Sequence, residues 1–180
     1  MNAEKLKEIC LNHIKWLNNE GGEKADLSRA NLSGSNLYGS NISRADLSYA
    51  NLSRADLYGA NISRADLSYA NLSGSNISRA DLSSADLSHA DLSGADISRA
   101  DLYGANLPHK YLSIGPIGSR NCIILYSYEY NVIICGCFKG SIKEFAEKVK
   151  STYQEGHKRR IEYDAAIDMI EKLRPLYDKK

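Results

Sequence analysis

Residues Ala45 to Gly74 read ADLSYANLSRADLYGANISRADLSYANLSG. This stretch repeats one five-residue phrase six times with small changes. The same phrase runs without a break from Ala25 to His109, seventeen times in all. Its first position is always Ala or Ser, its second Asp or Asn, and its third Leu or Ile. The fourth is Ser or Tyr until Pro108, and the fifth varies. Such strict self-similarity indicates a repeat architecture.

Neither regular secondary structure suits a period of five. In an α-helix, successive phrases are rotated by about 140°, so Leu27, Leu32 and Leu37 would scatter around the axis. In a flat strand, residues five apart fall on opposite faces. The pattern therefore requires a corner in every phrase. Four phrases then close a coil of about 20 residues, whose leucines point to a common axis.

The composition of the phrase agrees with such a coil. Each coil would bury four Leu or Ile side chains, each contributing about 1.5–3 kcal/mol when fully buried, and stacked coils would exclude water from one another. The small first position keeps the interior narrow, so a larger residue at Ala65 or Ala85 should cost about 1–3 kcal/mol. Asp and Asn suit corners because their short side chains accept hydrogen bonds from nearby backbone amides. We therefore interpret the nine Asp of the repeat as structural rather than catalytic.

The segment resembles the pentapeptide repeat family, whose consensus is A(D/N)LXX, in phrases such as Ala55-Asp56-Leu57-Tyr58-Gly59. The resemblance implies a right-handed quadrilateral β-helix. Seventeen phrases would give about four coils, about 20 Å tall at ~4.8 Å per coil. We expect a mainly β fold with three parts: an N-terminal capping helix in residues 1–24, the β-helix in residues 25–108, and a small C-terminal α+β (ββαα) module in residues 109–180.

Residues 20 apart should lie above one another and form columns on the coil. Such columns can simply cover the coil, or they can bind a protein, because Tyr and Arg are favoured at binding hot spots. Arg79 and Arg99 form one such column. The residues that we take as a candidate protein-binding surface are Tyr38 with Tyr58; Tyr49 with Tyr69 and His89; and Arg44 with Arg64.

Both flanks of the repeat can cover the open ends of the coil. Residues 3–18 form an amphipathic helix pattern, which Gly21-Gly22 is expected to end. Its apolar face would carry Leu6, Ile9, Cys10, His13, Ile14 and Leu17. The segment His13-Ile14-Lys15-Trp16-Leu17 is similar to the lead-in of many bacterial and phage pentapeptide repeats.

After Pro108 the five-residue period stops. Residues 115–121 favour a turn, and residues 121–127 and 131–138 favour a hairpin. Ser141 and Glu144 predict a capping box that opens a helix lined by Ile142, Phe145, Ala146, Val149 and Tyr153. A second helix is expected from about His157 to Arg174, with Tyr163, Ala166, Ile167, Ile170 and Leu173 on one side and Pro175 as its end. The runs Ile114–Arg120 and Cys135-Gly136-Cys137-Phe138 look like a tail of phage and prophage pentapeptide proteins.

The bulk composition narrows the function classes. The chain holds 23 Lys plus Arg and 22 Asp plus Glu, the repeat being at −3 and residues 111–180 at +3, so direct nucleic-acid or membrane binding is not expected. The N-terminus lacks the features of a signal peptide, and no apolar run is long enough to span a membrane. The scattered cysteines Cys10, Cys122, Cys135 and Cys137 suggest reduced thiols in the cytoplasm.

No motif indicates catalysis or a cofactor. The cysteines show no paired C-x-x-C spacing, and small buried side chains are the favoured interpretation over a zinc site. The run GPIGSR lacks the P-loop pattern, and the chain has no G-x-S-x-G. Lys158-Arg159-Arg160 is expected on the solvated side of a helix. We therefore predict no metal, no cofactor, no small-molecule substrate and no enzyme activity.

Two functions from different classes stay open. The first is a non-enzymatic scaffold that binds an unknown protein partner. The second follows from the resemblance, because some pentapeptide repeat proteins mimic duplex DNA and bind DNA gyrase. The short rod, its small net charge and the lack of Phe at its third positions depart from that pattern. The C-terminal module could cap its own rod or pair with a second copy to form a homodimer.

Overall fold

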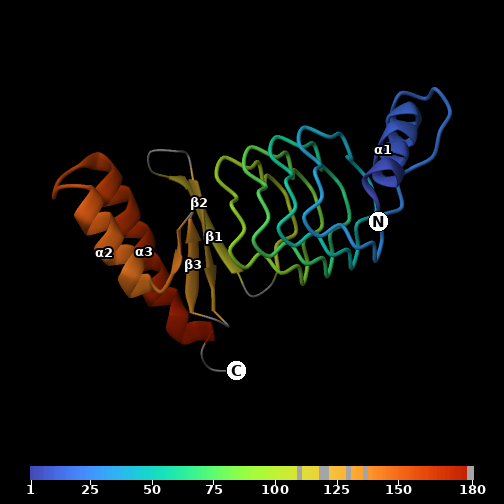
Figure 1. Cartoon of the computed structure of the whole chain (residues 1–180). Helices are drawn as coiled ribbons and strands as arrows, with labels where there is room; N and C mark the ends of the chain where they lie inside the picture. The colour runs from blue at the N-terminus through green and yellow to red at the C-terminus, as the bar shows by residue number, and fades with distance from the viewer. Residues whose placement is uncertain (109–110, 118–121, 129–130, 136–137, 178–180) are drawn as a thin grey trace. The chain divides into compact units, whose positions relative to one another are not determined.

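The computed structural model describes residues 1–108, 111–117, 122–128, 131–135 and 138–177. The chain divides into two compact units, Met1–His109 and Lys110–Lys180. The first holds one helix and the whole repeat, and the second holds a small sheet with two helices (Figure 1). Each unit is described below by itself.

Backbone pairing in the repeat joins each phrase to the fourth phrase after it. Thirteen isolated parallel bridges link residues 20 apart, from Asp26↔Asp46 to Asp86↔Asn106. Around each bridge, the Leu27 N–H donates to Asp46 O at 2.8 Å, and the Asp46 N–H donates to Ala25 O at 3.0 Å. The phrases therefore form a β-helix of four stacks, which we number by their first phrases, at Ala25, Ala30, Ser35 and Ser40.

The corner of each phrase is built by its second and fifth residues. In all sixteen phrases from Asp26 to Asp101, Oδ1 of the second residue accepts a hydrogen bond from the N–H of the fourth. The fifth residue of each of these phrases has a positive φ, from 57° at Arg29 to 70° at Gly94. The expected structural role of the repeated Asp and Asn is confirmed, since each one closes a local turn.

The third residues form the core of the coil. From Leu27 to Ile97, every Leu or Ile at this position is at most 3% exposed, and the small residues from Ala45 to Ala95 pack beside them. The strict apolar third position thus reflects one continuous interior, in which each coil covers the leucines of its neighbours.

Helix α1 (Ala3–Leu17) precedes the coil and largely matches the predicted helix. Asn2 caps its start by accepting a hydrogen bond from the Lys5 N–H at 2.8 Å. Leu6 and His13 are buried, whereas Ile14, expected on the same face, is 38% exposed. The helix ends at Leu17, one residue before the predicted bound, so Gly21-Gly22 is not the signal that ends it. Asn18 caps it, and Asn19 follows with φ 58°, because Asn tolerates the left-handed region.

Met1 and helix α1 also supply donors to the open edge of the first coil. Within the coil, second- and fourth-position carbonyls accept from amides of the preceding coil, as Asn51 O does from the Leu32 N–H. The first coil has no preceding coil, and there the backbone nitrogen of Met1 donates to Asn31 O at 2.8 Å. The ring of His13 reaches Ser43 O at 3.0 Å. The helix thus replaces part of a missing coil, which limits the hazard of an open strand edge.

The second unit contains a four-stranded antiparallel meander in the order β1-β2-β3-β4. Its strands are β1 (Tyr111–Ile117), β2 (Cys122–Ser127), β3 (Val132–Cys135) and β4 (Phe138–Gly140). The predicted hairpin corresponds to β2 and β3.

The ββαα prediction missed two strands of this sheet, β1 and β4. Residues 115–117, predicted as part of a turn, lie in β1, and residues 118–121 lie outside the described residues. The prediction failed because Pro116 argues against a strand. A register shift between Ile114 and Ile117 accommodates it.

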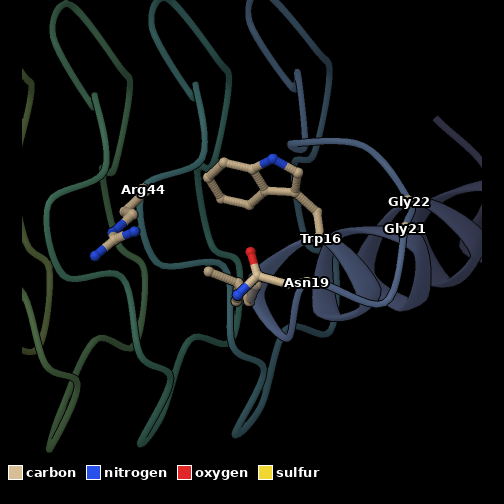
Figure 2. Close-up of a pocket in the computed structure, with 6 residues that line it drawn as sticks. Trp16, Asn19, Gly21, Gly22 and Arg44 are labelled. Carbon is tan, nitrogen blue, oxygen red and sulfur yellow. The ribbon is translucent and has the colours of Figure 1, made fainter.

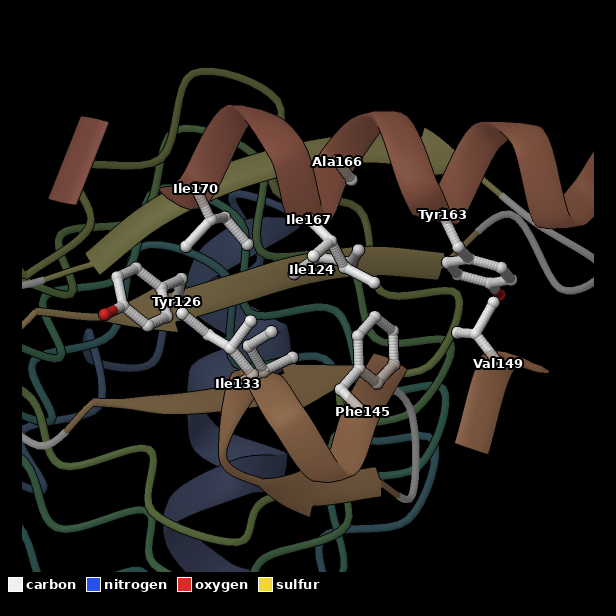
Figure 3. Packing of buried hydrophobic residues seen from close by; sticks show 10 residues of the cluster. Ile124, Tyr126, Ile133, Phe145, Val149, Tyr163, Ala166, Ile167 and Ile170 are labelled. Carbon is white, nitrogen blue, oxygen red and sulfur yellow. The ribbon is translucent and has the colours of Figure 1, made fainter. Parts of the chain in front are cut away.

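Helices α2 (Ile142–Thr152) and α3 (Lys158–Tyr177) complete the second unit. The predicted capping box is confirmed, since Ser141 and Glu144 bond each other's backbone N–H. The expected end of the last helix at Pro175 is wrong, because the helix runs two residues further with Pro175 inside its last turn. Both helices bury apolar residues against the sheet (Figure 3). Those in the core are Ile124, Tyr126, Ile133, Ile142, Phe145, Val149, Tyr163, Ala166, Ile167 and Ile170.

None of the helices in the described part of the chain is both long and apolar enough to cross a membrane.

Candidate protein-binding face

The first stack carries Asp at four successive second positions. It consists of the phrases that begin at Ala25, Ala45, Ala65, Ala85 and Ala105, and we call the outward side of its first four phrases the first face. Three parallel columns run along it: second positions Asp26, Asp46, Asp66 and Asp86; fourth positions Ser28, Ser48, Ser68 and Ser88; fifth positions Arg29, Tyr49, Tyr69 and His89.

The fifth-position column is a continuous stack of rings. The ring centroids of Tyr49 and Tyr69 are 4.7 Å apart, and those of Tyr69 and His89 are 4.5 Å apart, with ring planes within 9°. The guanidinium carbon of Arg29 lies 4.8 Å from the centroid of Tyr49. Both tyrosines are 49% exposed. The column therefore fixes its rings by mutual stacking while their edges face solvent.

The second-position column is a row of carboxylates. Each uses Oδ1 for its own turn, as in the 2.9 Å bond from the Ser68 N–H to Asp66. Hydrogen bonds from the Ser28 hydroxyl and N–H hold the pKa of Asp26 below its ordinary value. Burial opposes ionisation of Asp86, but bonds from Ser88 and Asn106 outweigh it and lower its pKa. Within residues 1–108, all of which are described, these carboxylates form no ion pair.

The net charge of the repeat is concentrated on this face. Its four aspartates and Arg29 give −3. The second stack has one Asp and one Arg, and the third and fourth stacks have two of each, so all three are neutral. The whole −3 of the coil thus lies beside the longest column of exposed aromatic rings.

The remaining candidate residues lie on other stacks. Tyr38 and Tyr58 stack at 5.3 Å in the third stack, where Arg79 lies over Tyr58 at 5.7 Å. Arg44 and Arg64 belong to the fourth stack. The predicted columns exist, but the seven candidate residues lie on three stacks and do not make one site.

Sequence reasoning missed the aspartate column and Arg29. The signal was available, because reading the second positions at intervals of 20 gives Asp four times in succession in this stack alone. The corner pattern explains these aspartates as structural residues, and they also have that role.

A shallow pocket of about 400 Å³ lies where α1 ends beside the coil. It is lined by Trp16, Leu17, Asn19, Gly21, Gly22 and Arg44, with the indole of Trp16 extending over the coil (Figure 2). Gly22 has φ 82°, and a Cβ there would overlap the backbone oxygen of Asn12. The sequence indicated only that the Gly pair follows a helix, so this pocket was not predicted.

The side chains of Cys10 and Cys135 are described by the structure. Cys10 is a half-buried thiol, and the half-buried side chain of Cys135 packs against the core of the second unit. Cys137 and the side chain of Cys122 lie outside the described residues. Among the residues that the structure describes, no group of three or more His, Cys, Asp or Glu is placed to hold a metal ion.

The family model for pentapeptide repeats matches residues 25–64, 40–79, 60–99 and 75–109. One solved structure, a pentapeptide repeat protein from Nostoc PCC 7120, is 34% identical over 57% of this chain and 87% of its own, with a TM-score of 0.35. Together these matches show that the chain belongs to the pentapeptide repeat family, whose members are generally non-enzymatic.

Two further solved structures match the chain. A pentapeptide repeat protein from the Arabidopsis thaliana thylakoid lumen is 28% identical over 43% of this chain and 58% of its own, with a TM-score of 0.34. One from Cyanothece 51142 is 37% identical over 47% of this chain and 60% of its own, with a TM-score of 0.21. The chain thus spans less than two thirds of each of these two proteins. No curated protein matches the chain.

Proposed function

We propose that this protein is a non-enzymatic scaffold whose first face binds a basic surface of a protein partner. The observation that carries the proposal is the coincidence, on one stack, of the entire −3 charge of the coil with the column Tyr49, Tyr69 and His89. The coil itself is proposed to have the right-handed, four-sided form of its family.

Physical considerations support this assignment. Stacked tyrosines lose little side-chain freedom on binding, because their neighbours already fix the rings. The carboxylates of Asp46 and Asp66 have no cationic partner in the coil, so a lysine or arginine of another protein can neutralise them without breaking an existing ion pair. Complementary charge also accelerates encounter, and this effect weakens as salt rises.

Immobilised peptides with alternating Lys and Ser provide a defined basic probe, with alternating Glu and Ser as the acidic control. We expect the full chain to bind the basic peptides and to lose at least tenfold in affinity when Tyr69→Ser and Asp66→Asn are combined. The matched control is Tyr103→Ser with Asp101→Asn in the fourth stack, where Tyr103 is 82% exposed. Equal losses in both double variants, or binding of the acidic peptides, would contradict the proposal.

Modulation of DNA gyrase by DNA mimicry is the second candidate, and the acidic column is the observation that favours it. The magnitude is small, however. Duplex DNA carries one charge per ≈ 1.7 Å, so the roughly 14 Å between Asp26 and Asp86, at ~4.8 Å per coil, would correspond to about eight charges. The first face carries −3. Unchanged supercoiling by gyrase in an excess of this protein would remove the candidate.

We further propose that the second unit pairs with a second copy, as one of the two roles open to it. The support is a set of exposed apolar side chains on α3: Ile161 at 59%, Met169 at 44% and Leu176 at 67%. Light scattering of the full chain should then give a dimer mass that Met169→Glu with Leu176→Glu reduces to one chain. If the unsubstituted chain has the mass of a monomer, pairing is wrong, and capping of its own coil is the remaining role of the second unit. The half-buried thiol of Cys10 is compatible with the cytoplasm as its location.

A further inference from the structure

His13 is a buried titratable side chain on α1 that takes no part in the proposed binding by the first face. It is fully buried, and both ring nitrogens are engaged. Nδ1 accepts a hydrogen bond from the Ala25 N–H at 2.9 Å, and Nε2 lies 3.0 Å from Ser43 O. A carbonyl can only accept, so Nε2 carries the proton and the ring is neutral. One imidazole thus ties α1 to the first residue of the repeat and to the end of the first coil.

The contact with Ser43 O replaces a backbone bond of the coil. The equivalent carbonyl one coil later, Ser63 O, accepts from the Arg44 N–H at 2.8 Å. In the first coil the His13 Nε2–H occupies that position instead. The neutral ring is therefore part of the pairing that ends the β-helix.

Protonation of this ring would break the arrangement. Nδ1–H would then face the Ala25 N–H, so that two donors oppose each other, and a positive charge would be buried. Burial lowers the pKa of His13; the Ser43 bond opposes this effect, and the charge of Lys24 adds to it. On α1, Cys10 lies one turn before His13, and burial raises the pKa of its thiol. Within residues 1–108, all of which are described, no carboxylate pairs with the ring.

We propose that His13 is an acid-sensitive latch, which holds α1 on the first coil when neutral and releases it when protonated. Release uncovers the carbonyls of Asn31 and Ser43 at the edge of the coil. The sign follows from the lowered pKa: the latch contributes its full stability above the ordinary value of 6.5 and loses it as the pH falls below that value.

Trp16, the only tryptophan of the chain, reports the latch directly. Its indole stacks on the ring of His13, with centroids 5.4 Å apart and ring planes 20° apart. We expect its emission to shift to longer wavelength between pH 7.5 and pH 5, with a midpoint below 6.5. Over the same range, amide hydrogen exchange should accelerate at least tenfold in α1, while the far-UV signal of the coil stays constant.

Three variants test the assignment. His89→Gln, an exposed histidine in the coil, should leave the pH response intact. Lys24→Glu should move the midpoint to higher pH, because it replaces a repelling charge with an attracting one. His13→Gln should abolish the response, either with α1 held throughout or with α1 released throughout. If α1 is released in His13→Gln, the Trp16 emission spectrum of this variant at pH 7.5 must equal that of the native chain at pH 5.

The proposal is overturned if the native chain shows the same Trp16 emission and the same α1 exchange at pH 7.5 and pH 5. It is also overturned if the response persists in His13→Gln.

Discussion

Tyr49 and Tyr69 lie in successive coils with their ring centroids 4.7 Å apart and their planes within 1°. They occupy the fifth positions of their phrases, where φ is 59° for both. A backbone that favours glycine thus carries a large aromatic residue, and the stack compensates part of that strain. Stacking therefore helps to hold the exposed rings in place.

Tyr69→Ala should destabilise the coil, because Tyr69 stacks on both Tyr49 and His89. The expected loss is about 1–2 kcal/mol in the free energy of unfolding, given about 0.5–1.5 kcal/mol for each aromatic pair. Tyr103→Ala is the control, since this side chain is 82% exposed. Denaturant unfolding followed by far-UV circular dichroism measures both. Equal effects would show that the stack contributes nothing.

Ser35→Ala should stabilise the coil by about 1 kcal/mol. The Ser35 hydroxyl is buried and has no hydrogen-bond partner, and removing an unsatisfied buried group recovers its desolvation cost. Ser75→Ala is the matched control, because the Ser75 hydroxyl donates to Leu72 O at 2.7 Å. Removing this hydroxyl loses a hydrogen bond and should not stabilise the coil. The melting temperature of Ser35→Ala should rise above that of the native chain, whereas that of Ser75→Ala should not. A lower melting temperature for Ser35→Ala contradicts this account.

Asp66→Asn should stabilise the coil at low salt by about 0.2–1 kcal/mol, the range for facing side-chain pairs. Asp66 has Asp46 and Asp86 above and below it, and like charges repel. Mixed columns instead form bonds between coils, as Asn76 Nδ2 does by donating to Asp56 Oδ1 at 3.1 Å. The gain should shrink in high salt, where charge repulsion is screened. A gain that does not depend on salt would argue against repulsion as the cause.

Phe145→Ala should destabilise the second unit by about 3–5 kcal/mol through the cavity it leaves. Phe145 is 4% exposed and contacts the rings of Phe138 and Tyr163, at 5.0 Å and 5.7 Å. Near-UV circular dichroism, which follows these aromatic residues, measures the loss. Lys148→Ala, on the exposed side of α2, is the control and should change little. A Phe145→Ala variant as stable as this control would contradict the packing in Figure 3.

The repeat could be predicted closely because its first three positions each hold one small set of residues. Leu or Ile at the third position of every phrase predicts a common axis, and the predicted interval of 20 is the one by which the bridges pair. The columns Tyr38 with Tyr58, and Tyr49 with Tyr69 and His89, are confirmed as stacked rings. The concentration of charge on one face also follows from the sequence, but only when charge is summed by stack rather than over the whole chain.

The rest depended on contacts that local patterns do not contain. His13 fits the apolar stripe of a helix, and nothing near it in sequence indicates bonds to Ala25 and Ser43. Strand β1 contains Pro116, so its pairing with β2 depends on a register shift that only the partner strand reveals. The last helix runs past Pro175 to Tyr177, although proline in that position lacks a helical N–H bond and disfavours the helical turn, so the local pattern predicted an earlier end.

The pairing of residues 20 apart underlies the core, the columns and the first face alike, and a cross-link tests it most directly. The hydroxyls of Ser33 and Ser53 are 2.9 Å apart. Ser33→Cys with Ser53→Cys should form a disulfide under mild oxidation, identified by mass spectrometry of proteolytic fragments. The control pair, Ser33→Cys with Ser48→Cys, lies on two different stacks and should stay reduced. A disulfide in the control pair, or none between positions 33 and 53, would contradict the stacked coil.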